Sequence, residues 1–158
     1  MKQEYERLPL RDNVSLIVFS GKKFLLVNLL DWEEDWWKFP QGGVEKGETL
    51  LEAGKRELKE EIGTDKINIV GQSKYTNSYV WPDELITKKQ NNYRGQSQRF
   101  LVFEFLGKSN DIMLGANEVR KYRWVTKKHI LEFSADREHM FFKNYNRLIP
   151  KILGEFLL

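Results

Sequence analysis

The segment from Gly42 to Gly63 constrains this chain more than any other part of its sequence. Two loop glycines and several carboxylates stand at fixed spacing around one short helix, predicted over residues 49–62. Thr49 and Glu52 form a capping box at the start of this helix. Gly63 stands where a left-handed C-terminal cap belongs. The best-defined helix of the chain is therefore also the place where its carboxylates concentrate.

The segments around this helix are mostly extended and apolar. Strands are predicted over residues 13–20, 24–30, 66–78, 97–106 and 121–125. Residues 82–94 are polar and predict a long loop. Helical spacing returns over residues 136–156, where Pro150 is expected to kink or divide the helix. Strands before and after a central helix, with a second helix at the end, predict an α/β fold of the mixed sandwich type.

Length and composition exclude several classes of protein. A chain of 158 residues predicts a single domain over residues 1–158. The absence of cysteine excludes disulfides, zinc–thiolate sites and thiol nucleophiles, and it fits a reducing cytosol. The N-terminus has no signal-peptide pattern and no apolar run reaches membrane-spanning length, so a cytoplasmic protein without membrane contact is predicted. The net charge of +3 does not by itself indicate a nucleic-acid binder. The oligomeric state is not indicated.

The predicted helix has an acidic face beside an apolar one. At about 100° per residue, Glu57, Glu60 and Glu61 fall within roughly a 100° arc. The adjacent arc carries Leu51, Gly54, Leu58 and Ile62. Like charges at these spacings repel, and a bound cation reverses that cost. Oxygen ligands of this kind suit Mg²⁺ or Mn²⁺. The alternative interpretation is a solvated acidic face, paired with lysine and arginine on the same helix.

The flanking pattern favours the metal-binding interpretation. It reads Gly42, five residues, Glu48, seven residues, then Arg56-Glu57-Leu58-x-Glu60-Glu61-x-Gly63. This pattern resembles the Nudix box, the signature of hydrolases that act on a nucleoside diphosphate linked to another moiety. Thr64 departs from it, because the family usually has an aliphatic residue there. The resemblance implies a loop–helix–loop segment within an α/β/α sandwich around a mixed β-sheet.

The same resemblance implies roles for residues of the box. Glu57, Glu60 and Glu61 are expected to be catalytic metal ligands, one of which also deprotonates the attacking water. Glu48 and Arg56 are expected to form an ion pair that fixes the loop to the helix. Gly42 and Gly63 are expected to be structural residues of the motif.

Further matches resemble one subgroup of the family. That subgroup contains RNA 5′-pyrophosphohydrolases and asymmetric diadenosine tetraphosphate hydrolases. Its W-x-F-P-Q-G-G entry resembles residues 37–43, and its Y-R-G-Q-x-Q-K-W strand resembles residues 93–100. Weaker matches are found at residues 11–14, 79–82, 118–125 and 141–143. Together the matches cover nearly the whole chain in order.

The subgroup matches imply further site residues. Glu118 is expected to join the metal site as a fourth catalytic carboxylate or to act as the base. The expected substrate-binding residues are Arg11, Gln41, Tyr79, Tyr93, Gln96, Phe142 and Lys143. Each also has a structural interpretation: an exposed acid for Glu118, a turn residue for Gln41, and packing or surface positions for the others.

The predicted function is metal-dependent hydrolysis of a phosphoanhydride bond. The substrate is expected to be a dinucleoside polyphosphate, such as diadenosine tetraphosphate, or the 5′-triphosphate end of RNA with release of pyrophosphate. An acidic loop at residues 31–35 argues against long RNA unless it points away from the substrate. The alternative is a nucleotide-sensing module of the same fold without significant catalysis. The presence of all three helix glutamates argues against that alternative.

Overall fold

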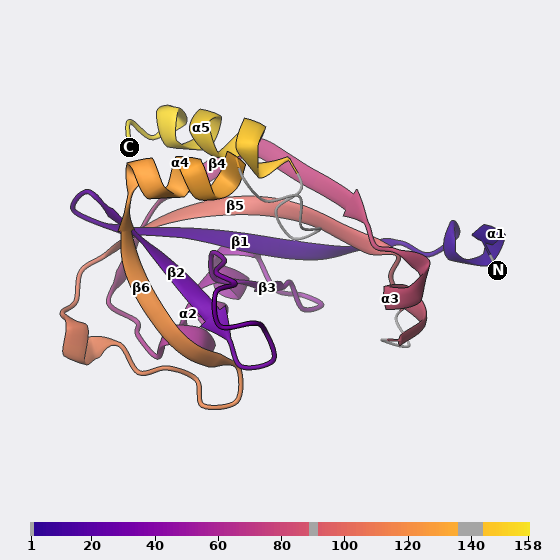
Figure 1. The fold of residues 1–158 in the computed structure, drawn as a ribbon, viewed down its shortest axis with the longest axis horizontal. Helices are drawn as coiled ribbons and strands as arrows, with labels where there is room; N and C mark the ends of the chain where they lie inside the picture. The colour runs from indigo at the N-terminus through magenta and orange to yellow at the C-terminus, as the bar shows by residue number, and fades with distance from the viewer. Residues whose placement is uncertain (1, 89–91, 136–143) are drawn as a thin grey trace.

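A mixed six-stranded sheet forms the centre of the protein (Figure 1). The computed structural model describes residues 2–88, 92–135 and 144–158. The strands are β1 (Leu10–Ser20), β2 (Lys23–Leu29), β3 (Gln41–Gly43), β4 (Ile67–Val80), β5 (Gly95–Phe105) and β6 (Val119–Thr126). They run in the order β4-β5-β1-β2-β6, with β3 paired to β1. Since β1 and β5 are parallel and the other pairs antiparallel, the predicted mixed sheet is confirmed.

Helices cover both faces of this sheet. Helix α2 (Leu50–Ile62) packs on one face, where its apolar side meets Leu16 and its neighbours. Helices α4 (Lys127–Ala135) and α5 (Tyr145–Glu155) pack on the other, against the core that contains Ile17. Side chains alternate between the faces along each strand, which is why Leu16 and Ile17 belong to different cores. The predicted α/β/α sandwich is confirmed.

Helix α2 begins and ends with the predicted capping residues. The hydroxyl of Thr49 accepts a hydrogen bond from the Glu52 N–H at 3.1 Å. Gly63 has a φ of +67°, the left-handed conformation that glycine adopts without a steric penalty. In the middle of the helix, a Cβ on Gly54 would lie only 2.9 Å from the side chain of Leu101. The absence of a side chain at Gly54 therefore lets the helix lie close to the sheet.

The prediction of a long loop over residues 82–94 is wrong in part. Helix α3 (Asp83–Lys88) occupies its first half. Proline fits the start of a helix, and Pro82 stands directly before this one. Ile86 is buried in a small cluster with Tyr79 and Trp81, apart from the two main cores. This tertiary packing stabilises a short helix that the polar sequence does not indicate. Helix α4 is likewise absent from the sequence prediction, as are the short helices α1 (Lys2–Tyr5) and η1 (Ser109–Asp111).

Helix α5 passes through Pro150 without being divided, contrary to one of the two expected effects of that proline. Pro150 lies on the exposed side, while the opposite side buries Leu148, Ile149, Ile152 and Leu153. Burial of four large apolar residues outweighs the hydrogen bond that proline removes. The preceding part of the predicted helix, residues 136–143, lies outside the described residues.

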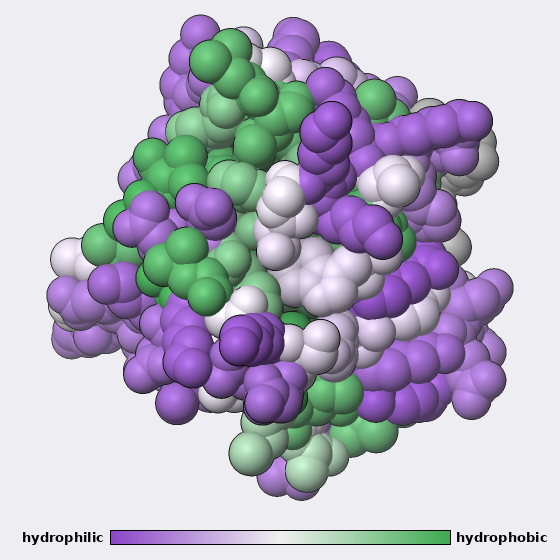
Figure 2. Space-filling model, turned by 90° about the vertical axis from the view of Figure 1, so that its left-hand side faces the viewer, coloured by the Kyte–Doolittle hydropathy of each residue, from purple (hydrophilic) through white to green (hydrophobic). Residues whose placement is uncertain are grey.

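The surface is mixed in character. At the end of the molecule shown in Figure 2, hydrophilic residues dominate one side of the view and hydrophobic residues gather on the other. Large apolar side chains that are exposed include Leu106, Met113 and Leu157. Within the part of the chain that the structure describes, no helix is long and apolar enough to cross a membrane.

Candidate active site

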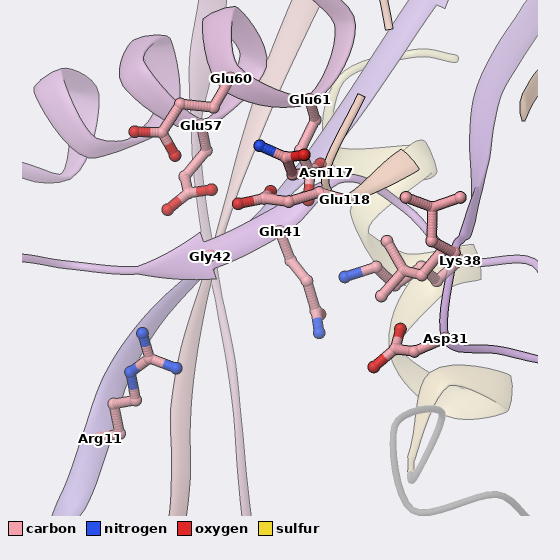
Figure 3. A pocket seen from close by; sticks show the side chains of 12 residues that line it. Arg11, Asp31, Lys38, Gln41, Gly42, Glu57, Glu60, Glu61, Asn117 and Glu118 are labelled. Carbon is pink, nitrogen blue, oxygen red and sulfur yellow. The ribbon is translucent and has the colours of Figure 1, made fainter. Parts of the chain in front are cut away.

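Helix α2 presents its carboxylates toward a pocket of about 470 Å³ (Figure 3). Glu57, Glu60 and Glu61 all line this pocket. Glu57 and Glu61 are buried, whereas Glu60 is exposed. The arc calculated from the sequence thus corresponds to one wall of a real cavity.

A distant loop brings the fourth carboxylate to the same place. Glu57, Glu60 and Glu118 each offer a carboxylate oxygen, and these oxygens lie within 4.8 Å of one another. The loop before Glu118 is held on the end of α2, because the Gly115 N–H donates to the Glu61 carbonyl at 3.0 Å. A Cβ on Gly115 would lie 2.2 Å from the carbonyl oxygen of Glu60, so this approach requires glycine. Glu118 therefore lies beside the helix carboxylates, the position that its motif predicts.

The two glycines of β3 make room for charged side chains on the pocket floor. A Cβ on Gly42 would lie 1.9 Å from the carboxyl carbon of Glu57. On Gly43, it would lie 2.2 Å from the guanidinium of Arg11. Any side chain at either position would displace the charged group. The glycine pair thus allows Glu57 and Arg11 to lie directly against the backbone.

Arg56 ties the preceding loop to the helix. Its Nε donates to Glu48 at 2.7 Å, and its Nη2 donates to the Gly43 carbonyl at 2.8 Å. Its Nη1 donates to Glu57 at 2.8 Å. The Arg56 hydrogen bond holds the pKa of Glu48 at about 2. One guanidinium therefore links the loop, β3 and a pocket carboxylate.

The pocket shifts the ionisation of its buried groups. Burial raises the pKa of Glu61 to about 8, although the nearby Lys38 opposes this shift. Burial also raises the pKa of Glu57, against the effect of Arg56. Conversely, burial lowers the pKa of Lys38, while the surrounding carboxylates oppose that change. The Oε2 atom of Glu61 is buried without a hydrogen-bond partner among the described residues. Strongly perturbed groups that share one cavity are typical of a catalytic site.

A buried amide network supports the pocket floor from behind. The Gln98 Nε2 donates to Gln41 and to Asn13, both at 3.1 Å. Its Oε1 accepts from Asn77 at 3.0 Å, and Asn77 accepts in turn from Asn144. Gln98 is fully buried. The network therefore fixes the direction of the Gln41 side chain, which lines the pocket.

The other predicted substrate contacts lie in different places. Arg11 and Gln41 line the pocket. Tyr79 and Gln96 are buried side by side on β4 and β5, outside the pocket lining, and Tyr93 packs on the small cluster around Tyr79. The roles predicted for these three residues in substrate binding stay predictions. Phe142 and Lys143 lie outside the described residues.

Several pocket residues were not predicted from the sequence. They are Asp31, Lys38 and Asn117, together with Leu29 and Leu30. Gly42, which was predicted as a structural residue of the motif, completes the wall. Asp31 shows that the acidic loop faces the pocket in part, whereas Glu34 of the same loop lies 3.7 Å from Arg120. The only sequence signal for Lys38 is its place between two apolar aromatic residues, Trp37 and Phe39. In an extended segment this alternation puts the lysine on the opposite side from both.

Comparison with known proteins agrees with this geometry. The profile of the NUDIX domain matches residues 9–144. The chain belongs to the Nudix family. An RNA pyrophosphohydrolase of Rickettsia conorii is 37% identical over 128 residues, covering 78% of this chain and 80% of that protein. One from Pelagibacter ubique is 29% identical over 158 residues, covering 98% of this chain and all of that protein.

Solved structures support the Nudix fold. The E. coli dihydroneopterin triphosphate pyrophosphohydrolase superposes with a TM-score of 0.67 at 16% identity, covering 92% of this chain and 99% of that one. A C. elegans Ap4A hydrolase superposes with a TM-score of 0.62 at 20% identity, covering 92% and 97%. The predicted resemblance is confirmed, and the chain is a Nudix hydrolase that acts on phosphoanhydride bonds. The alternative of a non-catalytic sensing module is not favoured.

The carboxylate cluster of this Nudix hydrolase is compatible with the divalent ions that the family generally uses. All donors that converge are carboxylate oxygens, which hard divalent cations prefer. Glu61, whose Oε2 has no hydrogen-bond partner among the described residues, adds a further carboxylate to the wall of the same pocket. The residues present therefore fit a divalent metal ion.

Proposed function

We propose that this Nudix hydrolase removes pyrophosphate from the 5′-triphosphate end of RNA. Support comes from relatives that match most of the chain and are named RNA pyrophosphohydrolases. The pocket adds a physical reason, because it sets carboxylates for metal ions beside the guanidinium of Arg11. In the reaction, water attacks a phosphorus of the anhydride and the bridging P–O bond breaks. The products are pyrophosphate and a 5′-monophosphorylated RNA.

The metal site that we propose consists of Glu57, Glu60 and Glu118, whose oxygens converge. Mg²⁺ or Mn²⁺ is the ion expected there, and when bound it neutralises phosphate charge and acidifies water. We propose that Glu61 is the general base that accepts the proton of the attacking water. Glu61 lines the pocket, and its Oε2 has no hydrogen-bond partner among the described residues. Arg11 and Gln41 are assigned to the phosphate chain. The activity on RNA 5′ ends remains a prediction. The single domain over residues 1–158 and the cytoplasmic location also remain predictions.

The test compares the wild-type protein with Glu61→Gln. Each is incubated with Mg²⁺ and either a triphosphorylated short RNA or diadenosine tetraphosphate. Wild-type protein is expected to release pyrophosphate from the RNA, and the variant to be slower by about 10²–10⁴-fold, the usual contribution of a positioned base. Glu52→Gln removes the same charge from an exposed position on the same helix and is expected to keep full activity.

Three results would contradict this proposal. Absence of metal-dependent product, or equal rates for wild type and Glu61→Gln, would exclude the assigned chemistry. Faster hydrolysis of diadenosine tetraphosphate than of RNA would identify a dinucleoside polyphosphate as the preferred substrate. The salt dependence of binding adds a further criterion for RNA as the substrate. For a single-stranded ligand, log K falls linearly with log[salt], with a slope of about −0.7 per phosphate contacted.

A further inference from the structure

Lys38 lies in the pocket wall at a place that none of the predicted substrate contacts occupies. Its backbone N–H and carbonyl both bond to Val27, at 3.0 and 2.9 Å, so the direction of its side chain is fixed. The flanking residues Trp37 and Phe39 point into the core beneath α4 and α5. The side chain of Lys38 therefore points the other way, into the pocket (Figure 3).

The ammonium of Lys38 is buried and has no hydrogen-bonded partner among the described residues. The residue is 6% exposed. Among the described residues, no hydrogen bond or ion pair holds its Nζ. This atom lies over the ring of Trp32, 5.7 Å from the ring centroid. The nearby carboxylates, including Glu61 and Asp31, attract it only through space. A buried charge without a hydrogen-bonded partner is costly, and an anion that enters the pocket from solution can supply that partner.

The pocket already contains one cationic contact, at the opposite side. Figure 3 shows Arg11 and Lys38 on either side of Gln41, with the carboxylates of Glu57 and Glu118 between and above them. A polyphosphate carries negative charge along its whole length. The carboxylates would hold the metal ions that neutralise part of this charge, while two fixed cations at the sides can each bind a further phosphate oxygen. The positive charge of Lys38 also offsets part of the negative charge of Asp31, which lines the same pocket.

We propose that Lys38 is a substrate-contacting residue, and that its ammonium donates to a phosphate oxygen on the side of the pocket away from Arg11. This inference rests on the proposed function only in that the ligand is a polyphosphate. The proposal predicts that a longer phosphate chain, which can contact both Arg11 and Lys38, binds more tightly than a shorter chain that contacts one of them.

The experiment measures binding rather than turnover. Inorganic tripolyphosphate is titrated into the protein by calorimetry, in Mg²⁺ and at fixed ionic strength, with pyrophosphate as the shorter probe. Lys38→Gln is expected to weaken tripolyphosphate binding about 10- to 100-fold, the effect of losing a charged hydrogen bond. Pyrophosphate binding is expected to change by less than about threefold. Lys38→Arg keeps the charge and is expected to recover part of the loss.

Two controls separate contact from an indirect effect. Lys55→Gln removes the same charge from an exposed position on α2 and is expected to change binding by less than about twofold. The rise in Tm with added Mg²⁺ reports the metal site, and Lys38→Gln is expected to leave it unchanged. Lys38→Met keeps the apolar stem of the side chain and serves as a second variant if the glutamine variant is not folded by circular dichroism.

The proposal is overturned by either of two outcomes. Tripolyphosphate binding that is unchanged, or reduced only as in Lys55→Gln, would show that the ammonium does not reach the phosphates. A loss accompanied by weaker Mg²⁺ binding would make Lys38 a positioning residue for the carboxylates. Since the readout is binding, these outcomes stay distinct from failure of the protein to hydrolyse RNA.

Discussion

At the scale of single residues, the site depends on side chains that are absent as much as on those that are present. Glu57 and Arg11 reach the pocket floor because Gly42 and Gly43 have no Cβ. The family pattern contains these glycines, but the reason for them becomes visible only when the two charged groups are seen against the backbone of β3.

Gly42→Ala is the direct test of this steric role. The new methyl group would overlap the Glu57 carboxylate and displace it by about an ångström, which is expected to lower kcat by roughly 10²-fold. The free energy of unfolding is expected to change much less, because the atoms displaced are the end of a flexible side chain and not backbone. Steady-state kinetics and urea unfolding measure the two effects.

Gly154→Ala is the matched control for that substitution. A Cβ on Gly154 meets nothing within 4 Å, and the residue lies in α5, far along the chain from the pocket. Activity is expected to stay at the wild-type level, with a gain in stability of about 0.5–1 kcal/mol from helix propensity. Full activity in Gly42→Ala would contradict the steric argument.

At the scale of elements, the loop and helix of the Nudix box behave as one unit joined by Arg56. Glu48 accepts two hydrogen bonds from this guanidinium, at 2.7 and 2.9 Å, and one from the Glu45 N–H at 2.9 Å. These bonds favour the ionised carboxylate, so the pKa of Glu48 falls from 4.5 to about 2 in the folded protein.

The lowered pKa predicts a pH dependence of stability. A group with a depressed folded pKa stabilises the protein above its unfolded pKa, and that stabilisation is lost as the pH falls through the folded value. Glu48→Gln is therefore expected to be less stable than wild type at pH 6, with a gap that narrows as the pH falls from about 4.5 toward 2. Urea unfolding at pH 6, 4 and 3 measures this gap.

Glu33→Gln serves as the charge-matched control for the loop–helix pair. Glu33 is exposed, so removal of its charge is expected to leave stability within about 0.5 kcal/mol of wild type at each pH. A gap for Glu48→Gln that is the same at pH 6 and pH 3 would show that the Arg56 pair does not couple protonation to folding.

At the scale of the whole molecule, the amide network around Gln98 connects the layers. It joins β1, β3, β4 and β5, and through Asn144 it reaches the start of α5. The network crosses from the pocket floor toward the core on the other face of the sheet. Its members are polar residues in strands that otherwise bury apolar groups, so a single defect affects several elements at once.

Gln98→Leu is expected to destabilise the protein substantially. The change removes the hydrogen bonds that Gln98 makes to the buried side chains of Asn13 and Asn77, at about 1–3 kcal/mol for each buried polar atom left unsatisfied. KM is also expected to rise, because Gln41 loses the bond that orients it. Gln72→Leu makes the same change at an exposed position of β4 and is expected to stay within about 0.5 kcal/mol. Equal stability of both variants would contradict a structural role for the network.

Much of the fold follows from local patterns in the sequence. The strands predicted at residues 13–20, 24–30 and 97–106 correspond to parts of β1, β2 and β5, because runs of apolar residues mark strands that are buried on both faces. The elements that were missed, α3 and α4, are short helices with weak periodicity. Each is stabilised by contacts with residues distant in sequence, such as Tyr5 and Leu8 for the cluster that contains Ile86.

The sequence by itself determined the capped helix, its acidic face and the family, since these depend on spacing within a few dozen residues. Only the tertiary structure decided how distant segments meet in one pocket, and that Asp31, Lys38 and Asn117 belong to it. Glu118 arrives there because a loop closes on the end of α2, and Lys38 points there because Val27 and the core hold its neighbours. Periodicity encodes the direction of a side chain along its own element. The distance between two elements depends on packing, and packing is determined by the whole chain.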